Sequence, residues 1–134
     1  MVCCGSINDN GDYMKKPSYK TLKKKLDTVF SRYIRLRDCF KSTGTPTYGV
    51  CVTCNKTVTY EESNAGHFMD RQHMATRWHE QNVNLQCVSC NKYNQGRQYE
   101  HGRYIAKEHE VFAYYQQFLF RNIKRISKES QRHE

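Results

Sequence analysis

Two cysteine pairs decide how this chain folds: Cys51-Val52-Thr53-Cys54 and, after a 32-residue insert, Cys87-Val88-Ser89-Cys90. A CxxC turn can place two thiolates on one metal ion, and two such turns supply the four sulfur ligands of a tetrahedral zinc site. Two redox pairs are the alternative, but no βαβ pattern of the thioredoxin type surrounds either pair. The spacing therefore predicts one structural Zn²⁺ bound by Cys51, Cys54, Cys87 and Cys90.

The insert between the pairs is longer than the ~15–20 residues of an ordinary ribbon-like zinc site. It contains Ala65-Gly66-His67-Phe68-Met69-Asp70-Arg71 and ends with Asn82-Val83-Asn84-Leu85-Gln86, and Asn91 directly follows the last cysteine. A zinc ion with four sulfur ligands has no open coordination position. Any catalysis must therefore use other residues, of which a histidine and several amides gather here.

The remaining three cysteines of the seven lie outside the pairs. Cys39 falls within a helical pattern, where we expect a small buried side chain. Cys3 and Cys4 are adjacent in an N-terminal stretch without periodicity, and we assign them no role.

The positive charge of the chain is concentrated in one segment. The formal net charge is +9 and the isoelectric point about 9.3, and residues 15–41 hold ten Lys or Arg against two Asp. Such a segment predicts a polyanionic partner, because neutralising phosphates releases counterions. The alternative is a merely solvated cationic face. The residues that we expect to contact DNA from this segment are Lys20, Lys23, Lys24, Lys25, Arg32 and Arg35.

Periodicity divides a single domain into four segments. They are a flexible lead (1–16), a basic amphipathic helix (17–41), a cysteine module (48–97) and an aromatic helix (101–129). The last helix has an apolar face that must pack on the first helix or on a second copy. The mean hydropathy is −0.93 and no apolar run approaches the ~20 residues of a membrane span. Because no signal peptide is visible either, we expect a cytoplasmic protein with no membrane partner.

The polar residues of the module suit phosphodiester hydrolysis. That reaction needs a base for water, a divalent cation to offset developing charge, and cationic groups to hold phosphate. A histidine and two amides lie near the zinc cysteines in the sequence. The basic residues that could hold the flanking phosphates are Arg71, Arg77, Lys92 and Arg97.

The module also resembles a known family. The order CxxC, AGHF, NVNLQC and CxxCN between Cys51 and Gly96 is similar to that of the phage NinG family of lambda-type recombination proteins, also called Rap. It resembles the HNH or ββα-metal nucleases as well, particularly phage endonuclease VII. The resemblance implies an α+β fold in which a zinc-bound ββα-metal (HNH, treble-clef-like) module is flanked by long N- and C-terminal helices.

The resemblance also implies roles for individual residues. His67 falls at the general base, Asn82 at the asparagine that braces the hairpin, and Asn91 at an amide ligand of the catalytic Mg²⁺ or Mn²⁺. One position departs from the family pattern, because Gly66 stands where a metal-binding aspartate is usual. The candidates to replace that ligand are Asp70, His73, His79 and Glu80, with His67 itself a further ligand of the ion.

The implied function is cleavage of branched double-stranded DNA. A metal-dependent endonuclease of this kind would cut recombination intermediates such as Holliday junctions and D-loops and leave a 5′ phosphate, in the cytoplasm of an infected bacterium. We expect a homodimer, with phage or host recombination proteins as further partners. The alternatives are a zinc-stabilised DNA-binding module without catalysis and a scaffold of a recombination complex.

Overall fold

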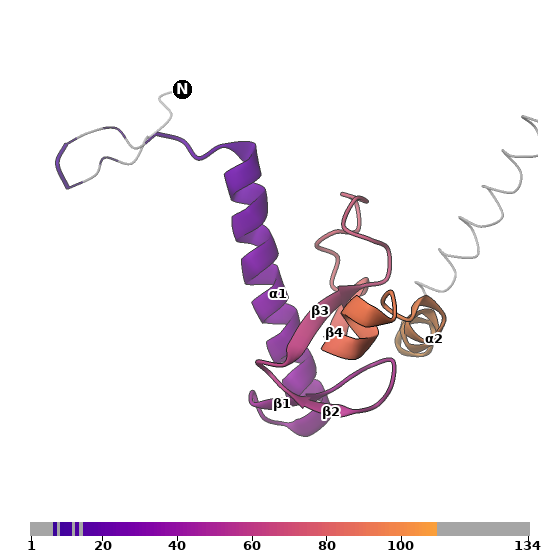
Figure 1. Cartoon of the computed structure of the whole chain (residues 1–134). Helices are drawn as coiled ribbons and strands as arrows, with labels where there is room; N and C mark the ends of the chain where they lie inside the picture. Colours follow the sequence, from indigo (N-terminus) through magenta and orange to yellow (C-terminus); the bar gives the residue numbers. More distant parts are fainter. Residues whose placement is uncertain (1–6, 8, 12, 14, 110–134) are drawn as a thin grey trace, which may run out of the picture.

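One long helix and six short elements form the described part of the chain. The computed structural model describes residues 7, 9–11, 13 and 15–109. The elements are α1 (Tyr19–Thr43), β1 (Tyr48–Val50), β2 (Thr57–Thr59), β3 (Ser63–His67), β4 (Val83–Cys87), the π-helical turn η1 (Ser89–Tyr93) and α2 (Gln98–Glu108) (Figure 1). The fold therefore mixes helices with small sheets, as expected. The predicted aromatic helix begins within α2, and its residues 110–129 lie outside the described residues, as does most of the predicted lead.

Helix α1 has a defined start and stop. The hydroxyl of Ser18 accepts a hydrogen bond from the Thr21 amide at 3.2 Å, which caps the first turn. Gly44 adopts a left-handed conformation (φ 72°), and its N–H donates to the Phe40 carbonyl at 2.9 Å. Twenty-five residues make a helix of about 37 Å. Its buried residues all lie in the second half, so α1 packs on the strands through its C-terminal half (Figure 1).

Two antiparallel pairs of strands carry the cysteines and the histidine. Strands β1 and β2 pair Gly49 with Val58, and the turn between them holds the first CxxC. Strands β3 and β4 pair Ala65 with Leu85, and a long loop, 68–82, connects them. Gly49 lets α1 and β4 approach closely, because a Cβ there would lie 3.0 Å from the Sγ atom of Cys39 in α1 and 2.6 Å from a methyl of Leu85 in β4.

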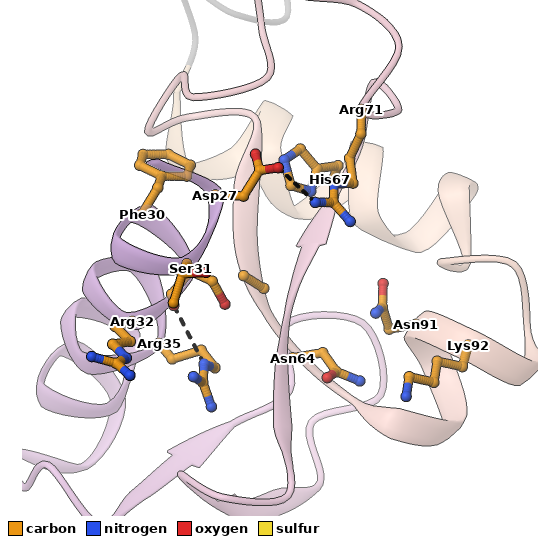
Figure 2. A pocket seen from close by; sticks show the side chains of 12 residues that line it. Asp27, Phe30, Ser31, Arg32, Arg35, Asn64, His67, Arg71, Asn91 and Lys92 are labelled. Atoms are coloured by element: carbon orange, nitrogen blue, oxygen red, sulfur yellow. Dashed lines mark hydrogen bonds and ion pairs between the residues drawn. The ribbon is translucent and has the colours of Figure 1, made fainter. Parts of the chain in front are cut away.

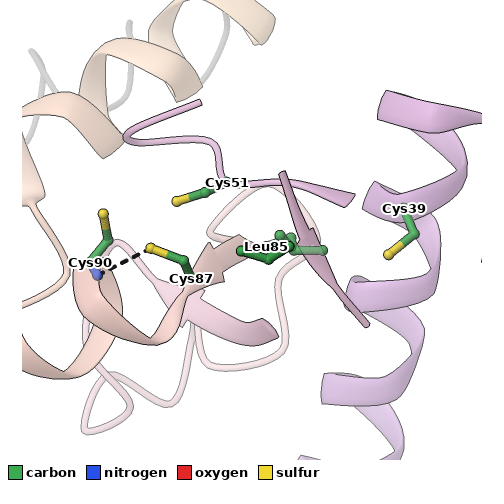
Figure 3. Close-up of a cluster of buried hydrophobic side chains, with 6 residues drawn as sticks. Cys39, Cys51, Leu85, Cys87 and Cys90 are labelled. Carbon is green, nitrogen blue, oxygen red and sulfur yellow. Dashed lines mark hydrogen bonds between the residues drawn. The ribbon is translucent and has the colours of Figure 1, made fainter. Parts of the chain in front are cut away.

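The core is small and rich in sulfur (Figure 3). Cys39 is fully buried, as expected, and it belongs to the core cluster together with Cys51, Val58, Leu85, Cys87 and Cys90. A buried carboxylate joins α1 to β4, since Asp38 accepts from the Leu85 amide at 2.7 Å and from Arg37 at 2.7 Å. The guanidinium of Arg37 also donates to the carbonyls of Glu80 and Val83. These contacts fix β4 on α1.

Candidate functional site: a four-cysteine centre beside a cationic hollow

The four paired cysteines converge on one point. Their Sγ atoms all lie within 4.8 Å of one another, and three of the four residues are buried. The Sγ atoms of Cys54 and Cys87 are 3.8 Å apart, too far for a disulfide of ~2.05 Å. Sulfurs at the corners of a tetrahedron with ~2.3 Å metal bonds are ~3.8 Å apart. Figure 3 shows Cys51, Cys87 and Cys90 directed toward one centre. The cysteines could therefore hold a structural metal such as zinc.

Crowding of the thiols supports the same conclusion. Burial, together with nearby Cys51 and Cys90, raises the pKa of Cys54 to about 12. Burial also raises the pKa of Cys87. At Cys51, burial is outweighed by hydrogen bonds from the Thr53 hydroxyl and nearby amides, which lower the pKa to about 6. Four thiolates at this spacing would repel one another, and a bound cation would offset that repulsion.

A hollow of about 520 Å³ opens beside this centre. It follows the edge of β3, with α1 on one side and η1 on the other (Figure 2). The structure thus brings together six of the predicted residues from four parts of the chain. These six are Arg32, Arg35, His67, Arg71, Asn91 and Lys92. A second hollow of about 430 Å³ shares His67, Arg71 and Asn91 and adds Asp70.

His67 ends β3 and is oriented by the backbone. Its Nε2 lies 2.8 Å from the carbonyl oxygen of Arg77. A carbonyl only accepts, so Nε2 donates and Nδ1 of the neutral ring carries the lone pair. Burial lowers the pKa of His67, outweighing the Arg77 carbonyl, which favours the charged form, and the cations of Arg71 and Arg77 lower it further. The imidazole is therefore neutral at neutral pH.

Asn82 lies behind the site and outside both hollows. Its side chain is fully buried. The amide nitrogen donates to the carbonyls of Met69 at 2.9 Å and Thr76 at 3.0 Å, and the amide oxygen accepts from the Met69 N–H at 2.8 Å. Thr76 precedes Arg77, whose carbonyl orients His67. Asn82 therefore holds the loop that positions the imidazole.

Asp27 of α1 is a site residue that the sequence analysis missed. It accepts from Arg77 Nε at 2.8 Å, from Trp78 Nε1 at 3.0 Å and from Arg71 at 2.9 Å. The Arg77 contact is the main cause that lowers the pKa of Asp27 to about 2. The available signal was an acid, one of two, in a strongly basic segment. Arg77 is 8% exposed and committed to this carboxylate, so we leave it out of the proposed DNA surface.

Asn64 is a second residue without a sequence-based prediction. It lines the larger hollow. Its Nδ2 is buried and has no hydrogen-bond partner among the described residues. Its only signal was its place three residues before His67. An unpaired donor at this point is available to a ligand oxygen.

The space beside Gly66 is filled by Gln86. A Cβ on Gly66 would lie 1.9 Å from the Gln86 Oε1 atom. The Gln86 amide is held in this orientation, because its Nε2 donates to the Gly96 carbonyl at 2.8 Å. A carboxylate at position 66 therefore has no room.

The remaining predicted residues lie farther out. Asp70 has a side chain 65% exposed and accepts from the Gln72 amide at 2.9 Å. His73 lies 3.9 Å from Asp70 and lines neither hollow. Arg97 pairs with Glu100 at 2.9 Å. The lysines at 20, 23, 24 and 25 lie on the N-terminal half of α1, outside both hollows. Within the described ranges, only the four cysteines form a close group of three or more His, Cys, Asp or Glu ligands.

These features define a small, cationic α+β protein with four clustered cysteines that could hold a metal, beside a hollow lined by a histidine, amides and guanidinium groups. The chain belongs to the NinG family, since the family described as "Bacteriophage Lambda NinG protein" matches residues 12–128. Membership is consistent with a role in phage recombination. No curated protein and no solved structure gave a match. None of the helices in the described residues is long and apolar enough to cross a membrane.

Proposed function

We propose that this protein is a metal-dependent endonuclease that cleaves branched DNA intermediates of phage recombination, such as Holliday junctions and D-loops. One observation carries the proposal. The His67 imidazole is neutral, has Nε2 bonded to a backbone carbonyl and lines a hollow rich in Arg and Lys. A base beside phosphate-binding groups is the arrangement that hydrolysis of a phosphodiester needs.

Five residues of the larger hollow have a task in this reaction. Nδ1 of His67 accepts a proton from a water molecule, whose oxygen attacks phosphorus. The bond to the 3′ oxygen breaks and that oxygen takes up a proton from solvent water, so the products are a 3′ hydroxyl and a 5′ phosphate. Arg32 and Arg35 on one side and Lys92 on the other bind phosphate oxygens. The unpaired Nδ2 of Asn64 offers a neutral donor to the same group.

The second hollow suits a divalent cation. Asp70 and Asn91 line it with His67, and a carboxylate and an amide oxygen are donors that Mg²⁺ or Mn²⁺ accepts, with water filling other positions. His73, near Asp70, is an alternative donor for the softer Mn²⁺. When bound, the cation offsets charge on the pentavalent phosphorus and on the leaving oxygen.

We further propose that α1 guides the DNA. Lys20, Lys24 and Lys25 lie on the same helix as Arg32 and Arg35, which open into the hollow. A phosphate backbone following these cations reaches His67. Two opposed cuts in a junction call for two sites, so we propose a homodimer; its predicted interface, 111–126, lies outside the described residues. We propose that the protein acts in the bacterial cytoplasm together with phage or host recombination proteins.

A zinc-stabilised DNA-binding module without catalysis is the second candidate. The space taken by Gln86 at Gly66 favours it, because the usual carboxylate of the catalytic ion has no place there. A scaffold role would likewise leave junctions uncut. The two candidates differ from the nuclease in a single measurement.

That measurement is cleavage of a labelled four-way junction with Mg²⁺, with Mn²⁺ and with EDTA. We expect cleavage with either cation, and a loss of ~10²-fold or more in His67→Ala, the range for a lost general base. Zinc content and junction binding should stay as in the wild type. Because the neutral imidazole is the base, the cleavage rate should rise with pH through a pKa below the ordinary 6.5 and be flat at neutral pH.

His109→Ala is the matched control, since His109 follows α2 and lines neither hollow. It should cleave at the wild-type rate. If His67→Ala also cuts junctions at that rate, the site assignment is wrong. If the wild type binds junctions with either cation and cuts none, the DNA-binding module is the correct function.

A further inference from the structure

Helix α1 carries an exposed apolar stripe that the site does not use. Its residues alternate three and four positions apart, which is the a/d pattern of a coiled-coil seam. Each is between 38% and 70% exposed. We define the α1 seam as these seven residues: Tyr19, Leu22, Leu26, Val29, Tyr33, Leu36 and Phe40.

The seam is separate from the face that packs on the strands. The buried residues of α1 are Ile34, Asp38 and Cys39, and none belongs to the a/d positions. The stripe from 19 to 40 extends for about 32 Å. A continuous apolar strip of this length on an otherwise charged helix marks an interaction surface. The alternating spacing of three and four residues is the spacing that packs against a second α-helix.

The charges beside the seam indicate the chemistry of that helix. In the heptad, Lys23 falls at an e position and Lys25 and Arg32 at g positions, which face the flanks of a partner helix. Within the described chain none of these three side chains forms an ion pair. Both acids of α1 point inward, because Asp27 binds Arg77 and Asp38 binds Arg37. The N-terminal half of the seam is thus flanked by unpaired cations.

This charge pattern argues against coverage by the protein itself. A second α1 would place Lys and Arg against Lys and Arg, which is destabilising. The apolar segment 111–128 of this chain has four cations, Arg121, Lys124, Arg125 and Lys128, and no acid. DNA would bind the cations beside the seam, but the apolar side chains of the seam would stay exposed to water. A helix of another protein with acidic residues on its flanks would match both the apolar side chains of the seam and the cations beside it.

We propose that the α1 seam binds an amphipathic helix of another protein, with apolar residues at the same 3–4 spacing and Asp or Glu on both flanks. This partner site goes beyond the proposed nuclease function. Lys23 and Lys25 would serve both partner and DNA, so the bound helix would compete for these two cations. Lys20 and Lys24 lie off the heptad flanks and would remain available to DNA.

The test uses the full chain and two synthetic three-heptad peptides. Both have Leu at a and d; one has Glu at every e and g position, and the other has Lys. By fluorescence anisotropy we expect the Glu peptide to bind at least about 10-fold more tightly than the Lys peptide. Leu26→Glu and Tyr33→Glu should each weaken binding about 10-fold or more. Thr21→Glu adds the same charge at a c position, off the seam, and should change binding by less than about 2-fold.

Four outcomes would overturn the proposal. The first is no binding of the Glu peptide, and the second is equal binding of both peptides. The third is a dimer in sedimentation that excludes the peptide and that Leu26→Glu dissociates, which assigns the seam to a second copy. The fourth is binding that appears only in Leu119→Glu, which assigns it to residues 111–128. Zinc content checks the fold of each variant. If Leu26→Glu misfolds, the comparison of the Glu and Lys peptides on the wild-type protein still tests the proposal. No readout depends on DNA cleavage.

Discussion

Gln86 shows how one side chain can change what its neighbour is able to do. It is fully buried, and its Nε2 donates to the Gly96 carbonyl and to the Thr53 hydroxyl. Its Oε1 has no donor among the described residues and occupies the space of a side chain at position 66. The resemblance to HNH nucleases led us to expect an aspartate where this chain has Gly66. Gln86 and Gly66 therefore form a coupled pair in which the amide replaces the carboxylate in space.

Gly66→Asp tests this coupling. The new Cβ would lie 1.9 Å from Gln86 Oε1, and such overpacking costs about 1–3 kcal/mol of the free energy of unfolding. Gln86→Ala alone should also destabilise, because the Gly96 carbonyl loses its donor. The double variant should be more stable than the sum of the two losses allows. Denaturant unfolding of the zinc-loaded protein measures all three, and strictly additive losses would contradict the coupling.

At the scale of elements, the helix and the loop are joined by one carboxylate. Asp27 of α1 receives Arg77, Trp78 and Arg71 of the loop 68–82. The same loop supplies the carbonyl that orients His67. The ion pair therefore sets the distance between the cations of α1 and the proposed base.

Asp27→Asn should loosen this junction. The folded pKa of Asp27 is about 2 against 3.8 for the free group, so ionisation contributes about 2 kcal/mol. This stability is present above pH 3.8 and is lost as the pH falls toward 2. At pH 7 we expect a loss of about 2 kcal/mol or more, since Arg77 stays buried without its charge partner. Trp78 is the single tryptophan, and its fluorescence reports the release.

Glu61→Gln is the matched control for that variant, because Glu61 is exposed and on a turn away from the loop. It should change the free energy of unfolding by less than about 0.5 kcal/mol. If Asp27→Asn keeps both the wild-type stability and the wild-type Trp78 emission, the carboxylate does not hold the loop.

The elements differ in how well the sequence alone predicted them. Helix α1 and the cysteine turns have local signals, namely an apolar period, a Ser cap and CxxC spacing, and the gathering of the four sulfurs is confirmed. No periodic pattern predicted strands β3 and β4, and only the resemblance to ββα-metal proteins implied a hairpin here. Asn84 and Gln86 make β4 look half-exposed, yet all five residues of β4 are buried. Their partners come from elsewhere, since His101 of α2 lies 3.0 Å from the Asn84 oxygen.

The candidate site was predicted to a similar extent. The order of the His67 and Asn91 motifs relative to the cysteine pairs predicted that both residues belong to the site. Both residues line the same hollow. Asp27 and Asn64 were missed because their roles depend on contacts between α1, β3 and the loop, which leave no periodic pattern. The exposed seam was equally hidden, because amphipathicity alone does not say which face packs inward.

At the scale of the molecule, the four-cysteine cluster and the core are one structure. Cys51, Cys87 and Cys90 belong to the buried cluster together with Leu85 and Val58. Among the described residues, few large apolar side chains are buried besides these. A core this small would gain stability from a metal held by the four cysteines.

Cys87→Ser should therefore lose metal and structure together. Elemental analysis is expected to find one zinc per wild-type chain and less in the variant, with loss of helical circular dichroism. Cys39→Ala is the control, because Cys39 is equally buried but not a ligand; it should keep zinc and lose about 1–3 kcal/mol of stability. Folded wild-type protein without zinc would show that the cysteines are only packed.

The net charge of +9 contributes to the affinity of the whole molecule for DNA. Because much of that charge lies on α1, we expect DNA to bind mainly at this helix. If α1 carries the phosphate contacts, replacing Lys23, Lys24 and Lys25 with Ala should weaken junction binding. Each lost contact lowers the slope of log affinity against log salt by ~0.9, so three contacts lower it by up to ~2.7. A triple variant of Lys56, Arg103 and Lys107, which are exposed on other elements, removes the same charge. That control should leave the slope nearly unchanged.

Two outcomes would contradict the prediction. If both triple variants lower the slope equally, only net charge matters. If neither variant changes the slope, the α1 lysines are merely solvated.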